Sequence, residues 1–159
     1  MLSALRKRLH KDEEGFTLIE LMVVVLIIAI LIAIAIPTFL GARGRANDRA
    51  AQSNLRNALT AEKTYFTDQQ VYTDNTANGI TAIEPSLSYT GTAASLASTG
   101  NLVYAVTSTT TTTNDTVTLG AQSGSGKCFW LRDNTATGTK YASSSAPCAV
   151  PGTINGSSW

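Results

Sequence analysis

Residues 16–36 form the only long apolar run in this chain, and Glu20 is the one charged side chain within it. About 20 apolar residues in α-helical conformation are enough to cross the hydrocarbon core of a bilayer. The run is longer than the apolar core of an ordinary secretory signal, and an Ala-x-Ala cleavage site such as 33–35 would fall inside it. The sequence therefore predicts one membrane-spanning helix that stays on the mature protein.

The carboxylate of Glu20 is the unusual element of this run. A charged side chain at the centre of a membrane helix costs about 2.5–3.5 kcal/mol on insertion scales, so its presence calls for a partner. The segment before the run is polar, and it ends at Gly15 and Phe16. A processing enzyme that cuts between these two residues would leave the whole apolar helix in place and create a new α-amino group on Phe16.

The junction Gly15-Phe16-Thr17-Leu18-Ile19-Glu20, with the apolar residues 21–25 after it and Pro37 further on, resembles the N-terminus of a type IV prepilin. The same pattern is shared by the pseudopilins of type II secretion. The resemblance covers roughly residues 6–67, and the rest of the chain is similar to the family only in organisation. It implies cleavage after Gly15 by a prepilin peptidase on the cytoplasmic face and methylation of the Phe16 amine.

Glu20 and the new amine on Phe16 are expected to act together. In a bundle of identical helices staggered along their axis, Glu20 of one subunit can meet the Phe16 amine of its neighbour. Such a pair neutralises two groups that each resist burial, and it favours ordered side-by-side assembly. The resemblance implies the same role for this glutamate in subunit docking. The alternative is that Glu20 reaches the lipid headgroups from the helix end.

Orientation in the membrane is only weakly indicated by charge. Basic residues before the apolar run favour a cytoplasmic N-terminus. The basic residues after the run, however, reduce this asymmetry. The leading set is Arg6, Lys7, Arg8 and Lys11, and the following set is Arg43, Arg45 and Arg49. The junction motif and the cysteine pair therefore carry the assignment of the C-terminal part to the outside.

The helix is expected to continue beyond the apolar run to about Thr67. Pro37, Gly41 and Gly44 should weaken it locally, because proline removes a backbone donor and glycine disfavours helix interiors. This stretch is interpreted either as a simple kink or as a segment able to extend in a filament. Side chains at helical spacing then predict an amphipathic second half: Ala51, Leu55, Ala58, Leu59, Glu62, Tyr65 and Phe66.

The C-terminal part predicts an antiparallel sheet of about four strands packed on this helix, so the fold class is α+β. The expected strands are residues 102–106, 116–119, 128–131 and 139–142, with loops at 108–115, 124–126 and 133–138. The predicted organisation is a leader (1–15), the long helix (16–67, its apolar part 16–36), a connecting region with little regular structure (68–101), the sheet region (102–149) and a tail (150–159) that is polar except for its terminal tryptophan.

Cys128 and Cys148 are the only cysteines. An even pair in an exported domain indicates a disulfide, with two free thiols in a cytosolic domain as the alternative. The pair also resembles the C-terminal disulfide loop of many type IV pilins. Many pseudopilins instead stabilise this region with calcium, and no dense acidic cluster is present here: Asp115 and Asp133 are the only acids after Glu84. The pattern favours a pilin, with no metal and no cofactor expected.

Charge and catalytic residues exclude other classes of function. The leader holds four basic and three acidic residues, which leaves eight of each sign from the totals of 12 and 11. A neutral mature chain does not predict nucleic-acid binding, which needs clustered positive charge. The single histidine, His10, lies in the leader. No catalytic set can be built from the exported domain, so we expect no enzymatic activity.

These observations predict a structural pilin subunit. It would reside in the membrane as a single-pass protein, contact lipid, the prepilin peptidase and the assembly machinery, and then polymerise with other copies into a surface filament. The alternatives are a pseudopilin of a type II secretion system and a membrane-anchored binding module that never assembles. The sequence leaves open whether the filament serves adhesion, twitching motility, DNA uptake or secretion.

Overall fold

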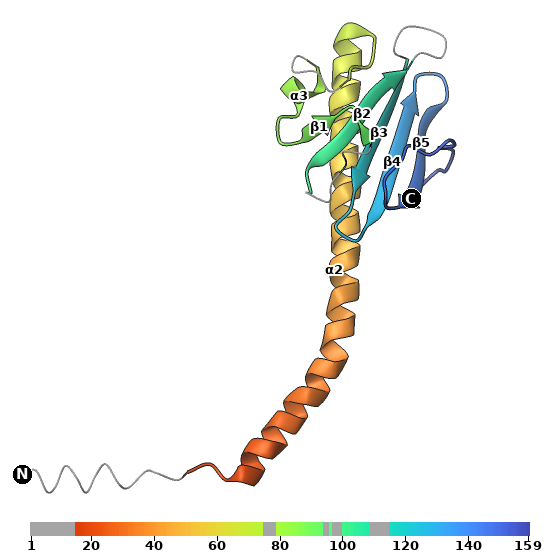
Figure 1. Ribbon diagram of the computed structural model, residues 1–159. Helices are drawn as coiled ribbons and strands as arrows, with labels where there is room; N and C mark the ends of the chain where they lie inside the picture. The colour runs from red at the N-terminus through yellow and green to blue at the C-terminus, as the bar shows by residue number, and fades with distance from the viewer. Residues whose placement is uncertain (1–14, 75–78, 94–95, 97–99, 109–114) are drawn as a thin grey trace, which may run out of the picture. The chain divides into compact units, whose positions relative to one another are not determined.

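The computed structural model describes residues 15–74, 79–93, 96, 100–108 and 115–159 (Figure 1). The chain divides into two compact units, Met1–Gly41 and Ala42–Trp159, and each is considered by itself. The leader before Gly15 and most of the loop predicted at 108–115 lie outside the described residues.

The first unit contains the beginning of the helix α2, Leu18–Gln69. Helix α2 is long and apolar enough to cross a membrane, and its most apolar window has no buried residue. The helix begins two residues after the predicted start at Phe16 and ends two residues after the predicted end at Thr67. The predicted long N-terminal helix is therefore confirmed.

In the second unit, α2 presents one apolar stripe to the sheet. Its buried residues are Ala51, Leu55, Ala58, Ala61 and Glu62. Leu59 and Phe66 are partly buried against the same core. These positions recur at three- and four-residue spacing, as an amphipathic helix requires. The amphipathic half predicted from the sequence is thus present, with Ala61 as an additional buried member.

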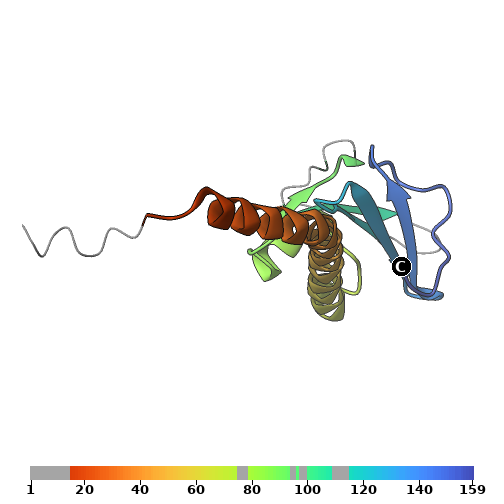
Figure 2. The same ribbon diagram turned by 90° about the horizontal axis from the view of Figure 1, so that it is seen from below.

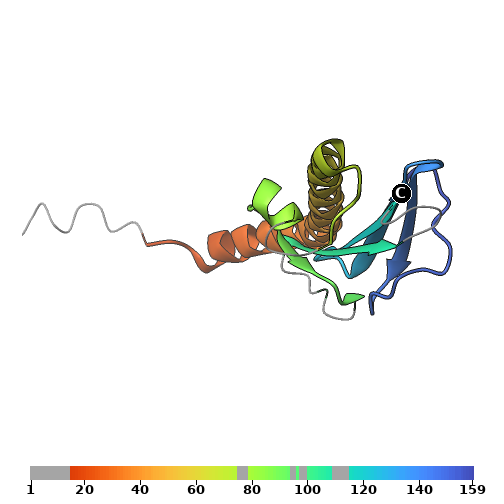
Figure 3. The same cartoon turned by 90° about the horizontal axis from the view of Figure 1, so that it is seen from above.

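Among the described residues the sheet has five strands in sequential order, one more than the predicted four. The strands are β1 (Ser88–Thr90), β2 (Leu102–Ser108), β3 (Thr116–Gln122), β4 (Lys127–Asn134) and β5 (Gly138–Ser145). Strands β2 to β5 pair antiparallel and contain all four predicted segments. Figures 2 and 3 show these strands as one layer beside the part of α2 that follows residue 42.

The connecting region contains more regular structure than predicted. A short helix, α3 (Ile80–Ile83), precedes β1. Strand β1 then pairs with β2 in the parallel direction, so the sheet is mixed rather than purely antiparallel. Ile80 and Leu87 are buried in the core that faces α2. The region predicted as a loop therefore contributes both an edge strand and core side chains.

Side chains alternate between the two faces of the sheet, and each face has its own core. The face toward α2 carries Val103, Ala105, Val117, Leu119, Ala121, Phe129 and Leu131. The opposite face carries Tyr104, Cys128 and Trp130, which pack with Leu96, Cys148 and Ile154. On β3, directly opposite Trp130, a glycine is required, because a β-carbon at Gly120 would lie 2.3 Å from the Trp130 ring. Tyr104, Phe129 and Trp130 are therefore core residues of the sheet.

The C-terminal tail is part of the fold, and its description as polar is incomplete. Ile154 is buried in the core on the face away from α2. Gly156 exchanges backbone hydrogen bonds of 2.9 and 3.0 Å with Tyr141 on β5. Trp159 packs edge-on against Phe129 and Tyr141, and its indole N–H donates to the Trp130 carbonyl at 3.0 Å. The tail thus covers part of the edge of β5.

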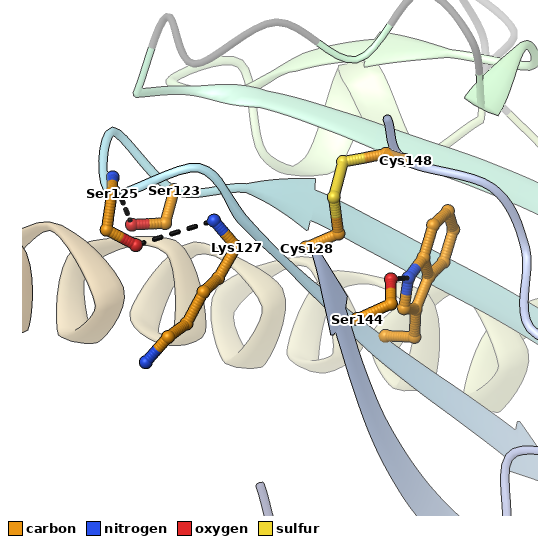
Figure 4. Close-up of a disulfide and its surroundings, with 7 residues drawn as sticks. Ser123, Ser125, Lys127, Cys128, Ser144 and Cys148 are labelled. Atoms are coloured by element: carbon orange, nitrogen blue, oxygen red, sulfur yellow. Dashed lines mark hydrogen bonds between the residues drawn. A yellow bond between two sulfur atoms is a disulfide. The ribbon is translucent and has the colours of Figure 1, made fainter. Parts of the chain in front are cut away.

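The predicted disulfide is present. Cys128 on β4 is bonded to Cys148, 20 residues later, in the segment after β5 (Figure 4). Both residues are buried in the core on the outer face of the sheet. Beside them the Trp130 indole donates to the Ser144 hydroxyl at 3.3 Å (Figure 4). A covalent bond and a side-chain hydrogen bond therefore hold β4 to β5 and to the segment that follows it.

Candidate functional site

The site is the N-terminal segment of α2, and its first feature is a helix cap. Thr17 precedes the helix, and its hydroxyl oxygen accepts the Glu20 N–H at 3.3 Å. The Thr17 carbonyl accepts the Leu21 N–H at 3.2 Å. A threonine followed by a glutamate three residues later is the spacing of a capping box. This role of Thr17 was not predicted from the sequence, although the Thr-x-x-Glu spacing indicates it.

Glu20 lies in the first turn of α2. A carboxylate there interacts favourably with the exposed N–H groups of the helix terminus, which gives Glu20 a local role in helix stability. Among the described residues, however, the Glu20 carboxylate has no hydrogen bond or ion pair. The charge is placed in an apolar helix and left available to a partner outside the described chain.

The surface around Glu20 is apolar in every direction. All large apolar side chains from Phe16 to Leu40 are between 47% and 84% exposed, and Phe16 is the most exposed. A helix that is apolar all round is stable only when lipid or other helices cover it. No described part of the first unit supplies that cover.

Gly15 and Phe16 lie before the first helical residue, in non-helical backbone. A β-carbon placed on Gly15 would meet nothing within 4 Å. Among the described residues, then, no side chain packs against Gly15, which suits recognition of this junction by a protease. That cleavage occurs here stays a prediction.

Pro37 lies inside α2 and cannot donate the hydrogen bond of that turn. The Thr38 hydroxyl donates to the Ile34 carbonyl at 3.1 Å in the same turn. A β-carbon at Gly44 would contact nothing within 4 Å, so packing within the described chain does not require glycine there. Gly41 ends the first unit. The predicted kink or extensible segment stays a prediction.

At the start of the second unit, Asp48 on α2 binds the turn between β3 and β4. Its carboxylate accepts the Ser123 hydroxyl at 2.7 Å, the Lys127 ammonium at 3.1 Å and the Ser125 hydroxyl. Figure 4 shows Ser123, Ser125 and Lys127 together on this turn. Burial raises the pKa of Asp48, but the hydrogen bonds and Lys127 outweigh it, so the pKa is lowered. Asp48 therefore holds α2 to the turn between β3 and β4 through hydrogen bonds and an ion pair.

Near the end of α2 a second acid behaves in the opposite way. Glu62 is fully buried, and its Oε2 accepts the Thr73 N–H at 3.1 Å. Its Oε1 has no partner among the described residues. Burial and, to a smaller extent, the nearby Asp74 raise the pKa of Glu62 to about 8, although the Thr73 hydrogen bond acts to lower it. Glu62 is therefore mostly neutral at pH 7, as its place in the apolar stripe requires.

A third acid, Asp133 on β4, joins the sheet to α2. It is buried and accepts hydrogen bonds from the Tyr72 and Thr139 hydroxyls. The Lys63 ammonium lies 3.5 Å from its Oδ1. Among the residues described, no group of three metal-binding side chains occurs. These acids therefore serve packing between the elements of the second unit.

Comparison with known proteins supports this segment as the functional part. Residues 10–36 match the family described as the prokaryotic N-terminal methylation motif. The chain is 46% identical over 67 residues to the type IV major pilin protein PilA of Myxococcus xanthus, covering 42% of this chain and 30% of that protein. It is equally identical, over the same length, to the type IV wide pilus major component PilA4 of Thermus thermophilus, covering 51% of that protein.

A third relative is the fimbrial protein EcpC of Eikenella corrodens, 39% identical over 82 residues, which covers 46% of this chain and 49% of that protein. The alignments thus span about half of these relatives' length or less. No solved structure matches the chain.

The fold and the site together define a class: an α+β protein in which the long helix α2 starts with an uncovered apolar half and carries a glutamate in its first turn, next to the capping residue Thr17. The comparisons make the class specific. Over its N-terminal part this chain is similar to type IV pilins, and the resemblance indicated by the Gly15–Glu20 junction is confirmed.

Proposed function

We propose that this protein is the structural subunit of a type IV pilus. The observation that carries the proposal is the first half of α2, which is apolar on every face and uncovered from Phe16 to Leu40. The methylation motif at residues 10–36 and the similarity to proteins named as pilus components support it. Such a surface needs lipid before assembly and other copies of the same helix afterwards.

Processing is the first step of the proposal. A prepilin peptidase cuts after Gly15, where the backbone is non-helical and free of side-chain obstruction. The new amine on Phe16 is then methylated. The exposed position of Phe16 supports access by both activities.

Assembly is the second step. The Phe16 amine of one subunit meets the Glu20 carboxylate of its neighbour, and the two charges neutralise each other inside the bundle. Breaking a buried pair by removing one partner costs about 3–5 kcal/mol. The apolar contacts between helices allow many axial positions, and the ion pair would favour the single position in which the two charges meet. The absence of a partner for Glu20 within the described chain supports this arrangement. The α+β domains remain on the outside of the filament.

The proposal assigns the protein two locations. It is a single-pass membrane protein before assembly and part of a surface filament afterwards, extracted from the membrane by the pilus assembly machinery. A pseudopilin of type II secretion uses the same N-terminal chemistry, and a membrane-anchored binding module uses only the anchor. Both are outcomes of the experiment below.

The experiment is the intact mass and N-terminal sequence of the chain in filaments sheared from the cell surface. The proposal predicts long filaments built mainly of this chain, each copy starting at N-methylated Phe16. Processed chain found only in the envelope, with no surface filament, would indicate a pseudopilin. Chain that keeps the residues before Phe16 and stays as single copies in the membrane would overturn the proposal.

A further inference from the structure

Two cations lie directly opposite each other on neighbouring strands. Arg132 on β4 is in register with Lys140 on β5. Each lies two residues from a member of the outer core, Trp130 and Ala142, so both side chains belong to the face away from α2. Like charges at opposed positions of an antiparallel pair destabilise the sheet. This placement costs stability unless an anion lies between them.

Within the described residues neither cation is neutralised. The Arg132 Nε donates to the Thr118 hydroxyl at 3.2 Å, and no ion pair to Arg132 or Lys140 is present. The contrast with the next residue is clear, since Asp133 on the other face is paired with Lys63. The charge of Asp133 on the face toward α2 is therefore paired, whereas the two half-buried cations on the outer face have no ion-pair partner among the described residues.

The two cations line a cleft of about 500 Å³. This volume lies within the range of small-molecule sites, about 300–1,000 Å³. The polar side chains of the lining are those of Arg132, Lys140, Asp115, Asn134, Ser108, Thr116 and Thr137. With Asp115 counted as ionised, the three charged groups carry a formal charge of +1, which complements a monoanion better than a dianion.

The chemistry of the lining narrows the ligand further. A guanidinium is planar and matches a carboxylate with two parallel hydrogen bonds, while an ammonium adds a point charge. Ser108 and Thr137 bring hydroxyl groups to the rim of the cleft, and such groups pair with hydroxyls of a ligand. Ile154 contributes apolar surface. A small carboxylate that carries several hydroxyls fits this set.

We propose that the cleft over β4, β5 and the neighbouring ends of β2 and β3 is a binding site for a sugar acid. Arg132 and Lys140 hold the carboxylate, and the hydroxyl-bearing residues orient the ring. The site belongs to the second unit alone, so it is independent of processing and of filament assembly.

The test uses the full chain in detergent micelles, with glucuronate as the probe and backbone amide chemical shifts as the readout. We expect saturable shifts at residues 132–140 with glucuronate and none with glucose, which has the hydroxyls but lacks the charge. Lys140→Gln and Arg132→Gln should each weaken binding at least about tenfold, the factor that corresponds to about 1.4 kcal/mol.

Arg49→Gln is the matched control, because Arg49 is an exposed cation on α2 outside the cleft. It should bind glucuronate as the unaltered chain does. Unchanged shifts at the amides of β1 and of residues 102–105 of β2, which lie away from the cleft, would show in both cleft variants that the sheet is intact. The proposal is overturned if glucuronate produces no saturable shift, if glucose binds equally well, if inorganic phosphate binds more tightly than glucuronate, or if the cleft variants bind normally.

Discussion

The two halves of α2 have the same secondary structure and opposite surroundings. Residues 18–41 are apolar on all faces and exposed, whereas residues 42–69 bury one stripe against the sheet of the same chain. The second half is a conventional amphipathic helix, which the fold itself satisfies. The first half has no cover among the described residues, so its stability depends on lipid or on other copies. One half of α2 is thus covered by its own chain, and the other half must be covered by other molecules.

The acids of the two halves show the same difference. Glu62, in the second half, is buried by its own domain, stays mostly neutral and accepts one backbone hydrogen bond. Glu20, in the first half, has only the helix terminus and no partner for its carboxylate among the described residues. A buried acid can be stabilised by losing its charge or by gaining a cation. Glu62 shows the first solution, and the proposed pairing of Glu20 with a neighbour's Phe16 amine would be the second.

The largest expected effect comes from removing the charge in the first half. Glu20→Ala should abolish filaments, because loss of one member of a buried pair costs about 3–5 kcal/mol, which is more than about 100-fold in the constant for subunit addition. Electron microscopy and quantitation of sheared surface material measure it. Asp68→Ala, which removes an exposed acid at the other end of α2, should assemble normally. Abundant filaments of the Glu20→Ala chain would contradict the account.

Next in size is a comparison of two leucines, one from each half. Leu55→Ala should lower the free energy of unfolding of the second unit by about 2–5 kcal/mol, because Leu55 is fully buried. Leu26→Ala should leave that value unchanged, because Leu26 is 60% exposed. Denaturant titration in micelles, followed by tryptophan fluorescence, measures both. Equal losses for the two variants would show that the halves are not energetically distinct.

The disulfide belongs only to the second unit. Replacing Cys128 and Cys148 with serine should lower its unfolding free energy by about 3 kcal/mol, as expected for a closed loop of about 20 residues. The same titration, with and without a reducing agent, measures this. The helical content of the first half should not change in circular dichroism. A double variant as stable as the oxidised chain would show that the disulfide does not stabilise the domain.

The smallest effect concerns Glu62. Its folded pKa of about 8 lies above the ordinary value of 4.5, so the folded state holds a proton that the unfolded state releases. The free energy of unfolding should therefore fall as pH rises from about 4.5 to about 8. Glu62→Gln should remove this slope and add on the order of 1–3 kcal/mol at pH 7. Titrations at a series of pH values test this, and an unchanged slope in the variant would refute it.

Much of the fold could be predicted because it depends on local patterns. The apolar run, the three- and four-residue spacing of the stripe and the four longer strands are all visible in the order of side chains. Strand β1 was missed because it has three residues and one apolar side chain, and its parallel pairing with β2 depends on distant sequence. Pattern alone does not identify such an edge strand.

The part of the candidate site that could be predicted is the part that forms a short sequence motif. Residues 15–20 were found from their order, but the cap at Thr17 was overlooked although its spacing was visible. The contacts of Asp48 with the β3–β4 turn and the packing of Trp159 against Tyr141 could not be predicted, because each joins residues far apart in the chain. An isolated aspartate on a helix or a tryptophan in a tail has no local signature of its tertiary partner.

The most direct test is a cryo-electron microscopy reconstruction of the surface filament. The account predicts a core in which residues 18–41 are fully covered by neighbouring copies, with the Glu20 carboxylate within about 4 Å of a neighbour's Phe16 amine. A filament in which this half of α2 faces solvent, or in which Glu20 and the amine lie far apart, would contradict it.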